Sequence, residues 1–366
     1  MDESCVVVFP TVFARNKVPQ LVLNIKKILR ARGQKFKSVR RDGDVVLINA
    51  NDPVFASSAV NLLFGIDRVA IARRTEADFA SIVSGIATVG GNLLLKGEKF
   101  LVRVDGSTRG FVAKDAEIAA TSEIIEKKSK LGARPGTEQN HDKMLYAHVT
   151  KTGAYVCIFL DKGRGGVPHK SQTRRAVCAI YDEMSAVSCY ETIKQGYDVR
   201  IMVCYRNESE LAGLVRAVNQ IIPRLVRDRV ELDFYKMAAR PAGAGNYLAY
   251  VGTILGIMLQ YKERHVSLAL SPLVFPTEFI EDVSRRVFES GRVPIVPLAG
   301  VDDGLFEGAR EMGLERGIAR LEKMAGMTFK AGVFSKKAVE DAVSTKRSIT
   351  VRIGPNNVHD ILDSLE

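Results

Sequence analysis

The chain has 366 residues, and 53 Lys and Arg against 42 Asp and Glu leave a formal charge of +11. An apolar fraction of 46% excludes global disorder, and five cysteines without CxxC or CxxH spacing exclude a disulfide-stapled miniprotein. The longest near-apolar stretch, 247–261, is shorter than the roughly 20 residues of a membrane span, and the acidic start is unlike a signal peptide. We therefore expect a cytoplasmic protein with no membrane partner and no metal site.

The first 75 residues predict a ferredoxin-like domain. Apolar periodicity indicates a strand at 4–9, a helix at 18–32, strands at 36–41 and 44–49, a helix at 53–63 and a strand at 68–73. Asp42-Gly43 between two of the strands is a strong hairpin signal. In the first helix, Leu21, Leu23, Ile25, Ile28 and Leu29 are expected near one face. This β-α-β-β-α-β order is the ferredoxin-like plan.

Two further units follow in the chain. The second combines helices at 76–90 and 115–130 with strands at 99–105, 144–150 and 154–161, and residues 161–175 are expected to form a basic loop. From residue 176, strands at 176–181, 198–205, 230–235, 266–270 and 294–297 alternate with helices at 185–195, 208–227, 246–262 and 277–290, before a late strand at 348–353. Such alternation predicts a doubly wound parallel α/β sheet with helices on both faces, so the fold class is mixed α/β and α+β with several domains.

Positive charge is concentrated in the first half of the chain. Residues 1–175 carry 29 Lys and Arg against 17 Asp and Glu, a net +12, whereas residues 176–366 carry 24 against 25, a net −1. Ten cations, and no acidic residue, occur between Ser4 and Asp42. Because like charges repel, a nucleic acid that neutralises them is the preferred partner, and a basic surface helix without a partner is the alternative.

The turn after the strand at 176–181 bears on nucleotide binding. In a doubly wound sheet, anions bind at the first strand-to-helix turn, where glycines let the backbone approach the phosphates. Here Tyr181-Asp182-Glu183-Met184-Ser185 offers no glycine and two carboxylates, each repelling a triphosphate by about 1–4 kcal/mol. We expect Asp182 to cap the following helix instead. Gly243-Ala244-Gly245 also fails as a dinucleotide fingerprint, because the third glycine would fall at Leu248.

The order of the units resembles tRNA 4-thiouridine synthetase (ThiI-type), which has a ferredoxin-like domain, a THUMP domain and a PP-loop ATP-pyrophosphatase domain. The similarity reaches to about residue 325. It is carried by residues 165–168 (GGVP) with Gln172, by Ser185, Tyr190, Lys194 and Gly196, and by residues 297–302 (PLAGVD) and 309–313 (AREMG). The resemblance implies a ferredoxin-like domain at 1–75, a THUMP RNA-binding domain at 76–165, a basic linker at 166–175 and a PP-loop-like (adenine nucleotide alpha hydrolase-like) domain at 176–366.

The departures from the family pattern fall on its chemistry. The phosphate loop SGGxDS would align with Ile180, Tyr181, Asp182, Glu183, Met184 and Ser185, so only the last serine remains. The family's reactive cysteine would lie within residues 315–329, which contain none, and a later Gly–Glu loop is replaced around Ser271-Pro272. We therefore expect a degenerate ATP loop, no catalytic residue and no cofactor. Whether the protein is an enzyme stays open, because the resemblance itself implies a tRNA sulfurtransferase.

Several functions remain open at this point. The first is a tRNA-binding factor that is non-catalytic or works with a catalytic or sulfur-carrier partner protein, as a monomer or a homodimer. The alternative is an active sulfurtransferase that uses ATP and Mg with an altered site, making 4-thiouridine or supplying sulfur for thiamine synthesis. A structural protein whose basic face only aids solubility is the third. The residues expected to bind RNA are Arg15, Lys17, Lys26, Lys27, Arg30, Arg32, Lys35, Lys37, Arg40, Arg41, Arg103, Arg109, Arg164, Lys170, Arg174 and Arg175.

Overall fold

A computed structural model describes residues 4–108, 110–128, 132–238, 244–300, 302–314, 319, 335–354 and 357–365. The chain divides into two compact units, which we call the N-terminal unit (Met1–Val167) and the C-terminal unit (Pro168–Glu366). Within these described ranges, no helix is long and apolar enough to cross a membrane, and no group of three His, Cys, Asp or Glu side chains is arranged to hold a metal ion.

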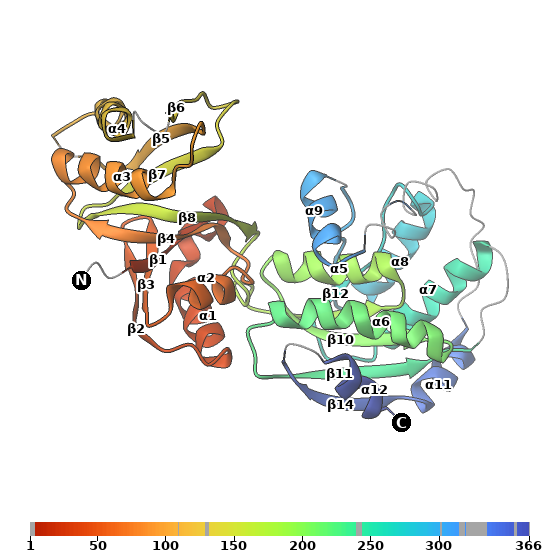
Figure 1. The fold of residues 1–366 in the computed structure, drawn as a ribbon. Helices are drawn as coiled ribbons and strands as arrows, with labels where there is room; N and C mark the ends of the chain where they lie inside the picture. The colour runs from red at the N-terminus through yellow and green to blue at the C-terminus, as the bar shows by residue number, and fades with distance from the viewer. Residues whose placement is uncertain are drawn as a thin grey trace. The chain divides into compact units, whose positions relative to one another are not determined.

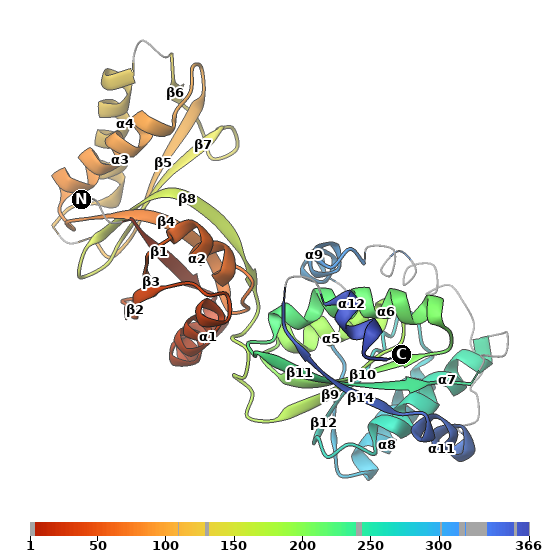
Figure 2. The same cartoon turned by 60° about the horizontal axis from the view of Figure 1, so that its bottom comes forward.

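The N-terminal unit begins with the ferredoxin-like order that the sequence predicts. Its elements are β1 (Ser4–Pro10), η1 (Val12–Lys17), α1 (Val18–Ala31), β2 (Phe36–Asp42), β3 (Val45–Ala50), α2 (Pro53–Val60) and β4 (Ile66–Thr75). The four strands pair antiparallel in the order β2-β3-β1-β4, and α1 packs against α2 (Figures 1 and 2). Gly43 turns the predicted hairpin with a φ of 64°, a conformation that suits glycine.

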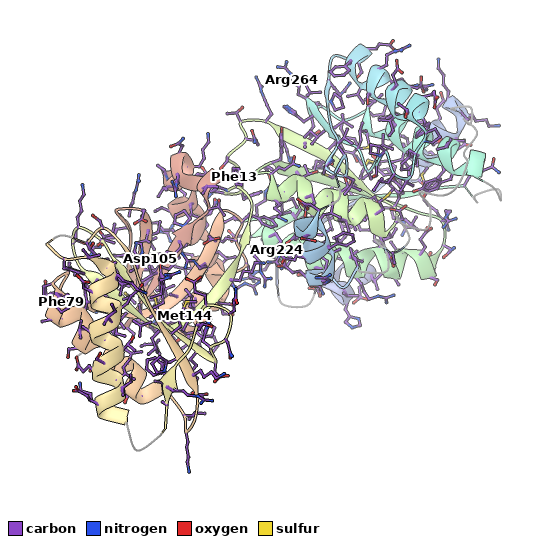
Figure 3. The ribbon with its side chains drawn as sticks, turned by 90° about the horizontal axis from the view of Figure 1, so that it is seen from above. Phe13, Phe79, Asp105, Met144, Arg224 and Arg264 are labelled. Carbon is purple, nitrogen blue, oxygen red and sulfur yellow. The ribbon has the colours of Figure 1, made fainter. Side chains whose placement is uncertain are left out.

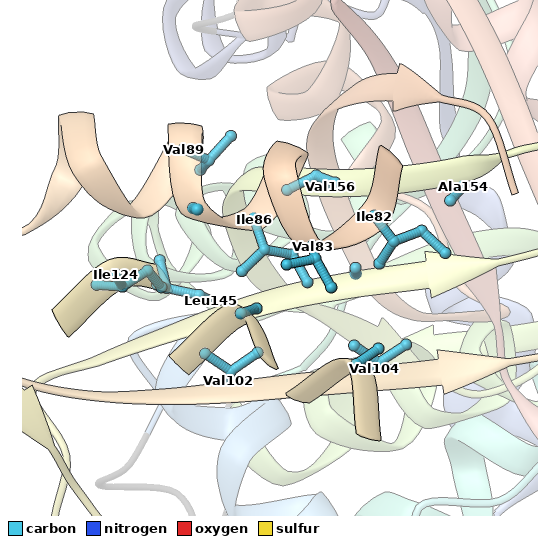
Figure 4. Packing of buried hydrophobic residues seen from close by; sticks show 14 of the residues in the cluster. Ile82, Val83, Ile86, Val89, Val102, Val104, Ile124, Leu145, Ala154 and Val156 are labelled. Carbon is cyan, nitrogen blue, oxygen red and sulfur yellow. The ribbon is translucent and has the colours of Figure 1, made fainter. Parts of the chain in front are cut away.

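The same sheet continues into the second half of the N-terminal unit. The elements there are α3 (Phe79–Leu93), β5 (Lys99–Gly106), α4 (Ala113–Lys128), β6 (Arg134–Pro135), β7 (Lys143–Val149) and β8 (Ala154–Gly165). β8 pairs antiparallel with β4, so one eight-stranded sheet runs in the order β2-β3-β1-β4-β8-β7-β5-β6. Figure 4 shows the core that α3 and α4 form on its strands, where Ile82 and Ile86 of α3 meet Val102, Leu145 and Val156.

A second cluster of buried side chains from β1, β3, β4, β7 and β8, among them Val7, Leu47 and Tyr155, packs elsewhere on the same sheet. Its polar centre is Asp42 at the end of β2, whose carboxylate oxygen Oδ2 accepts hydrogen bonds from the hydroxyls of Thr150 (2.8 Å), Thr152 (2.7 Å) and Tyr155 (2.6 Å). Burial alone raises the pKa of Asp42, but these three donors outweigh burial and hold that pKa below its usual value. The carboxylate therefore ties the predicted hairpin to the turn between β7 and β8.

The C-terminal unit has the doubly wound architecture that the sequence predicts. Its elements are β9 (Arg175–Ile180), α5 (Glu183–Lys194), β10 (Asp198–Tyr205), α6 (Glu208–Ile221), η3 (Ile222–Arg224), β11 (Arg229–Lys236), α7 (Ala244–Met258), β12 (His265–Ser267), α8 (Thr277–Glu289), β13 (Val293–Ile295), α9 (Asp303–Glu311), α11 (Lys336–Ser344), β14 (Arg347–Arg352) and α12 (Val358–Asp363). The sheet order is β13-β12-β9-β10-β11-β14, parallel except for β14. Figure 2 shows α5, α6, α9 and α12 on one face of the sheet and α7, α8 and α11 on the other.

Three sequence predictions are corrected by the structure. Leu23 is 52% exposed, because two residues along a helix turn the side chain about 200° away from Leu21 and its buried neighbours. Residues 161–165 are not loop but the end of β8, where Asp161 pairs with Val69 across the ladder. The helices expected at 53–63 and 208–227 end earlier, at Val60 and Ile221, and the second passes into η3 at Pro223.

Replacing Asp42 by Asn is expected to lower the stability of the N-terminal unit by about 1–3 kcal/mol at pH 7, because a neutral oxygen accepts three hydrogen bonds less well than a carboxylate. Since the folded-state pKa of Asp42 is depressed, its contribution is present above the unfolded pKa of about 3.9 and is lost as the pH falls through the folded pKa. Urea unfolding at pH 7 and pH 3 measures both effects. Asp67→Asn, at an exposed carboxylate, is the matched control, and equal losses in the two variants would contradict this role.

Candidate nucleotide loop and nucleic-acid interface

The turn between β9 and α5 is closed by its own hydrogen bonds. Asp182 is the N-cap of α5, as predicted, and its Oδ1 accepts the N–H of Ser185 at 2.8 Å. In return, the Ser185 hydroxyl oxygen accepts the backbone N–H groups of Tyr181 (2.8 Å) and Asp182 (2.9 Å). These N–H groups are therefore occupied by the protein and are not displayed to an anion.

Aromatic side chains crowd the same turn. The Tyr247 hydroxyl donates to Asp182 Oδ2 at 2.8 Å, and the buried Tyr181 ring meets the Tyr250 ring edge-on, with 6.1 Å between centroids. Arg206 also lies here, but Glu210 holds its guanidinium with two bonds, of 2.9 Å and 2.6 Å, and the Tyr250 ring packs against it. A cleft of about 510 Å³ remains beside these residues, lined by carboxylates as well as by Arg206 and Arg216.

The crevice where the strand order reverses is nearly filled. In doubly wound sheets, ligands bind outside the carboxyl ends of the strands at this switch point, here between β9 and β12. Tyr181, Leu268 and Leu270 close it from the strand ends, and α7 covers it with Ile254 and other apolar side chains. The cavity left there is about 20 Å³, room for about one water molecule and not for a nucleoside.

The ten cations predicted to bind RNA between residues 15 and 41 lie on neighbouring elements of the N-terminal unit. Arg15 and Lys17 are on η1, three are on α1 with Arg32 as its C-cap, and Lys37, Arg40 and Arg41 are on the edge strand β2. Most of the ten are exposed, with Lys26 and Arg32 half-buried. No carboxylate of the described residues lies within ion-pair distance of Lys27, Arg30 or Lys35. The sequence prediction that these charges lack local compensation is confirmed for these three.

The remaining predicted RNA-binding residues are dispersed, and three of them are already paired. Arg103 contacts Glu138 and Glu117, Lys170 lies 3.6 Å from Asp198, and Arg175 lies 3.8 Å from Glu263. Arg164 donates to the carbonyl of Asn61 at 3.2 Å, and Arg174 is exposed. Arg109 falls outside the described residues, as does the stretch 315–329 apart from Ala319. A phosphate would have to displace a carboxylate from each of these paired residues.

Sequence reasoning missed a polar hollow in the N-terminal unit. This hollow, of about 420 Å³, lies between β4 and α3, and its polar lining is Arg73, Arg74, Thr75, Ser81, Ser84 and Thr88. Residues 81, 84 and 88 are spaced by three and four, which places their hydroxyls on one face of a helix. Hydroxyl side chains at this spacing, shortly after Arg73 and Arg74 in the sequence, are the pattern that could have predicted the hollow.

Two curated proteins are similar in sequence to part of this chain. The chain is 27% identical over 194 residues to a probable tRNA sulfurtransferase of Methanosarcina acetivorans and 25% identical over 194 residues to that of Methanosarcina mazei. Each match covers 52% of this chain, which spans about half the length of these curated relatives (46% and 47%). No family model matches the chain.

Two solved structures share the fold. A 4-thiouridine synthetase–RNA complex with bound ATP has a TM-score of 0.67 and 14% identity, covering 95% of this chain and 100% of that one. PH1313 from Pyrococcus horikoshii has a TM-score of 0.64 and 16% identity, covering 85% of this chain and 99% of that one. The chain resembles the 4-thiouridine synthetase (ThiI-type) family. The predicted multidomain α/β and α+β fold class is confirmed with it.

The residues that carry the 4-thiouridine synthetase resemblance hold α5 against α9. The Tyr190 hydroxyl donates to Glu311 at 2.7 Å, and Lys194 donates to the carbonyl of Gly304 at 3.1 Å. Gly308 permits this approach, because a Cβ at that position would lie 2.7 Å from the Tyr190 ring. These contacts pack α5 against α9 and lie outside the turn at residues 181–184.

Replacing Ser185 by Ala is expected to destabilise the C-terminal unit by about 1–3 kcal/mol, because the N–H groups of Tyr181 and Asp182 lose their buried acceptor. Ser344→Ala, at an exposed serine that bonds within its own helix turn, is the control and is expected to change stability by less than about 0.5 kcal/mol. Thermal unfolding of the two variants measures the difference. Equal melting temperatures for Ser185→Ala and wild type would show that the cap is not needed.

Proposed function

We propose that the protein is a tRNA-binding factor of the 4-thiouridine synthetase type that lacks the ATP-dependent chemistry of that family, or depends on a partner for it. The observation that carries the proposal is the stretch of ten cations on η1, α1 and β2, within which Lys27, Arg30 and Lys35 meet no carboxylate of the described residues. Such a surface attracts a polyanion, and the name that the curated relatives carry, tRNA sulfurtransferase, supports tRNA as that polyanion.

The RNA contacts are proposed to come from the N-terminal unit. Residues 1–75 and the THUMP-like residues 76–165 would hold the RNA by phosphate contacts and backbone shape, with the hollow at Arg73 and Arg74 as part of that surface. The linker 166–175 would join them to the PP-loop-like residues 176–366, which would serve as a docking surface for a catalytic or sulfur-carrier partner, or for a second copy of the chain. A protein that binds tRNA would work in the cytoplasm.

The loop at residues 180–185 supports the non-catalytic reading. Phosphate binding at a helix start requires free N–H groups and a close backbone approach, but Ser185 and Asp182 already satisfy these groups. Asp182 and Glu183 add negative charge at the position of the phosphates. We therefore propose that the wild-type protein uses neither ATP nor Mg, and that no residue described here acts as a catalyst.

An active, ATP-dependent tRNA sulfurtransferase is the second candidate. It is favoured by the name that both curated relatives carry and by the cleft of about 510 Å³ beside Asp182, whose size is typical of a small-molecule site. In this case Arg206 would have to leave Glu210 in order to meet a phosphate. The product would be 4-thiouridine or sulfur passed to thiamine synthesis. Titration of the wild-type protein with Mg-ATP tests whether it is such an enzyme.

Changing Lys26, Lys27, Arg30 and Arg32 together to Glu is expected to abolish tRNA binding without unfolding the protein, because four phosphate-binding cations become four anions. In wild type, the logarithm of the binding constant is expected to fall steeply with the logarithm of the salt concentration, by about 0.7–0.9 for each phosphate contact. Filter binding across a salt series measures both the affinity and this slope.

The matched control places four Glu residues in the C-terminal unit, at Lys262, Arg264, Lys336 and Lys337, which are all exposed; Arg264 is labelled in Figure 3. It makes the same change in net charge and is expected to leave most of the affinity. Similar losses in both quadruple variants would mean that net charge, and not the surface of α1, determines binding. A flat salt dependence in wild type would also contradict the proposal.

Titration calorimetry with Mg-ATP is expected to show no binding to the wild-type protein, because the N–H groups of the turn are occupied and its carboxylates repel phosphate. The variant Ile180→Ser, Tyr181→Gly, Asp182→Gly and Met184→Asp restores the family loop and is the positive arm for nucleotide binding. Micromolar ATP binding by wild type, or 4-thiouridine formed in tRNA by wild type with a sulfide donor, would establish the second candidate instead.

A further inference from the structure

Two large apolar side chains at the start of α2 face solvent. Phe55 is 64% exposed and Val54 is 62% exposed, although both lie in the first turn of a helix whose N-cap is Asp52. Their neighbours on α2, such as Ala56 and Val60, are fully or nearly fully buried against the unit. Neither exposed side chain contributes to the core, so both apolar surfaces are available to a partner.

This exposed pair lies at the same end of the sheet as the C-terminus of α1. Phe36 at the start of β2 pairs with Ala50 at the end of β3. The connection from α1 to β2 and the connection from β3 to α2 therefore lie at the same end of the strands. The N–H of Asn51 donates to the carbonyl of Lys35 at 3.0 Å, which ties the two connections together. Figures 1 and 2 both show α1 and α2 side by side, in agreement with their packing.

The charge at this end of the unit is positive. Arg30 and Arg32 close α1, and Lys35 follows in the turn. Asp52 also lies at this end, where its carboxylate accepts the N–H groups of Val54 (3.0 Å) and Phe55 (3.1 Å) and thereby caps α2. The N–H groups of Val54 and Phe55 at the start of α2 are thus already hydrogen-bonded. An incoming anion is therefore attracted by the cations at the end of α1 and not by the N-terminus of α2.

We propose that Phe55 is a stacking platform for an unpaired RNA base, and that the phosphates flanking this base contact Arg30, Arg32 and Lys35. The exposed apolar ring offers a surface for the base face of a single-stranded nucleotide, and the cations at the same end of the sheet offer partners for its phosphates. Val54 widens the apolar surface at the ring. The inference rests on the proposed RNA-binding function and adds to it a residue type, an aromatic ring, that charge counting alone does not identify.

Three other phenylalanines among the described residues of the N-terminal unit are exposed. Phe13 on η1 is 71% exposed and is followed in the same helix by Arg15 and Lys17, so it also combines an apolar ring with cations. Phe159 on β8 is 52% exposed and lies two residues from Asp161. Phe79, labelled in Figure 3, is partly covered by Phe111, with 5.7 Å between the ring centroids. Phe159 is used as the control, an exposed ring on another element of the same unit.

The full-length protein offers a direct optical test, because its sequence contains no tryptophan. Phe55→Trp creates a single fluorescent reporter, and stacking of a base on it is expected to quench its emission when a single-stranded oligonucleotide or a tRNA is added. Phe159→Trp is expected to show no quenching under the same conditions. A blunt RNA duplex is expected to quench neither, because its bases are not free to stack on the ring.

Affinity measurements complete the test. Phe55→Ala is expected to weaken binding of the single-stranded oligonucleotide about 5- to 150-fold, from the usual stacking energy of about 1–3 kcal/mol per base, while the salt slope stays at the wild-type value. Phe159→Ala is expected to bind as wild type does. Circular dichroism and thermal unfolding show that each variant is folded.

Three results would overturn the inference. Wild-type affinity in Phe55→Ala together with unquenched Phe55→Trp, while tRNA still binds, would remove the platform and leave the proposed function intact; a protein partner at this patch would give this result. A reduced salt slope in Phe55→Ala would mean that the variant disturbs the cations and that stacking is not the cause. Absence of RNA binding by wild type would end both the inference and the proposed function.

Discussion

One antiparallel pairing, between β4 and β8, makes a single body of the N-terminal unit. The two strands are the longest in the unit, Ile66–Thr75 and Ala154–Gly165, and their ladder joins the ferredoxin-like half to the half that follows it in the chain. Every surface assigned to RNA here is carried by the resulting sheet, including the cations of α1 and β2 and the hollow between β4 and α3. These surfaces keep fixed positions relative to one another because the sheet does not break between them.

At the start of α5, capping and anion binding compete for the same backbone groups. An N–H group that donates to Ser185 or Asp182 is not available to a phosphate, and exchanging one for the other leaves a buried hydroxyl or carboxylate without its partner. The family's phosphate loop SGGxDS, which aligns with residues 180–185, has glycines at this point. These glycines leave the N–H groups open. The same strand and helix can therefore support either a stable closed turn or a phosphate site, depending on a few side chains.

The family resemblance is carried in part by contacts that lie away from the turn at residues 180–184. Tyr190, Lys194 and Gly308 hold α5 on α9 through a buried hydroxyl–carboxylate bond, a backbone carbonyl and a close helix approach. None of these contacts needs a nucleotide. A fold is maintained by its packing, whereas an activity depends on a few groups placed on that fold, so the two can change independently.

Local patterns in the sequence determined the elements of this protein, because strand and helix periodicities, the Asp42-Gly43 hairpin and the Asp182 cap depend on neighbouring residues. The uncompensated charge between residues 15 and 41 was equally visible, since it requires only counting. Tertiary structure decided what depends on distant partners: Asp42 bound by the β7–β8 turn, β8 extended by pairing with β4, and the carboxylates that occupy Arg103 and Arg175. It also decided that Phe55 is exposed at the end of the sheet where α1 ends, because a ring on a helix is buried or free according to what the rest of the unit places against it.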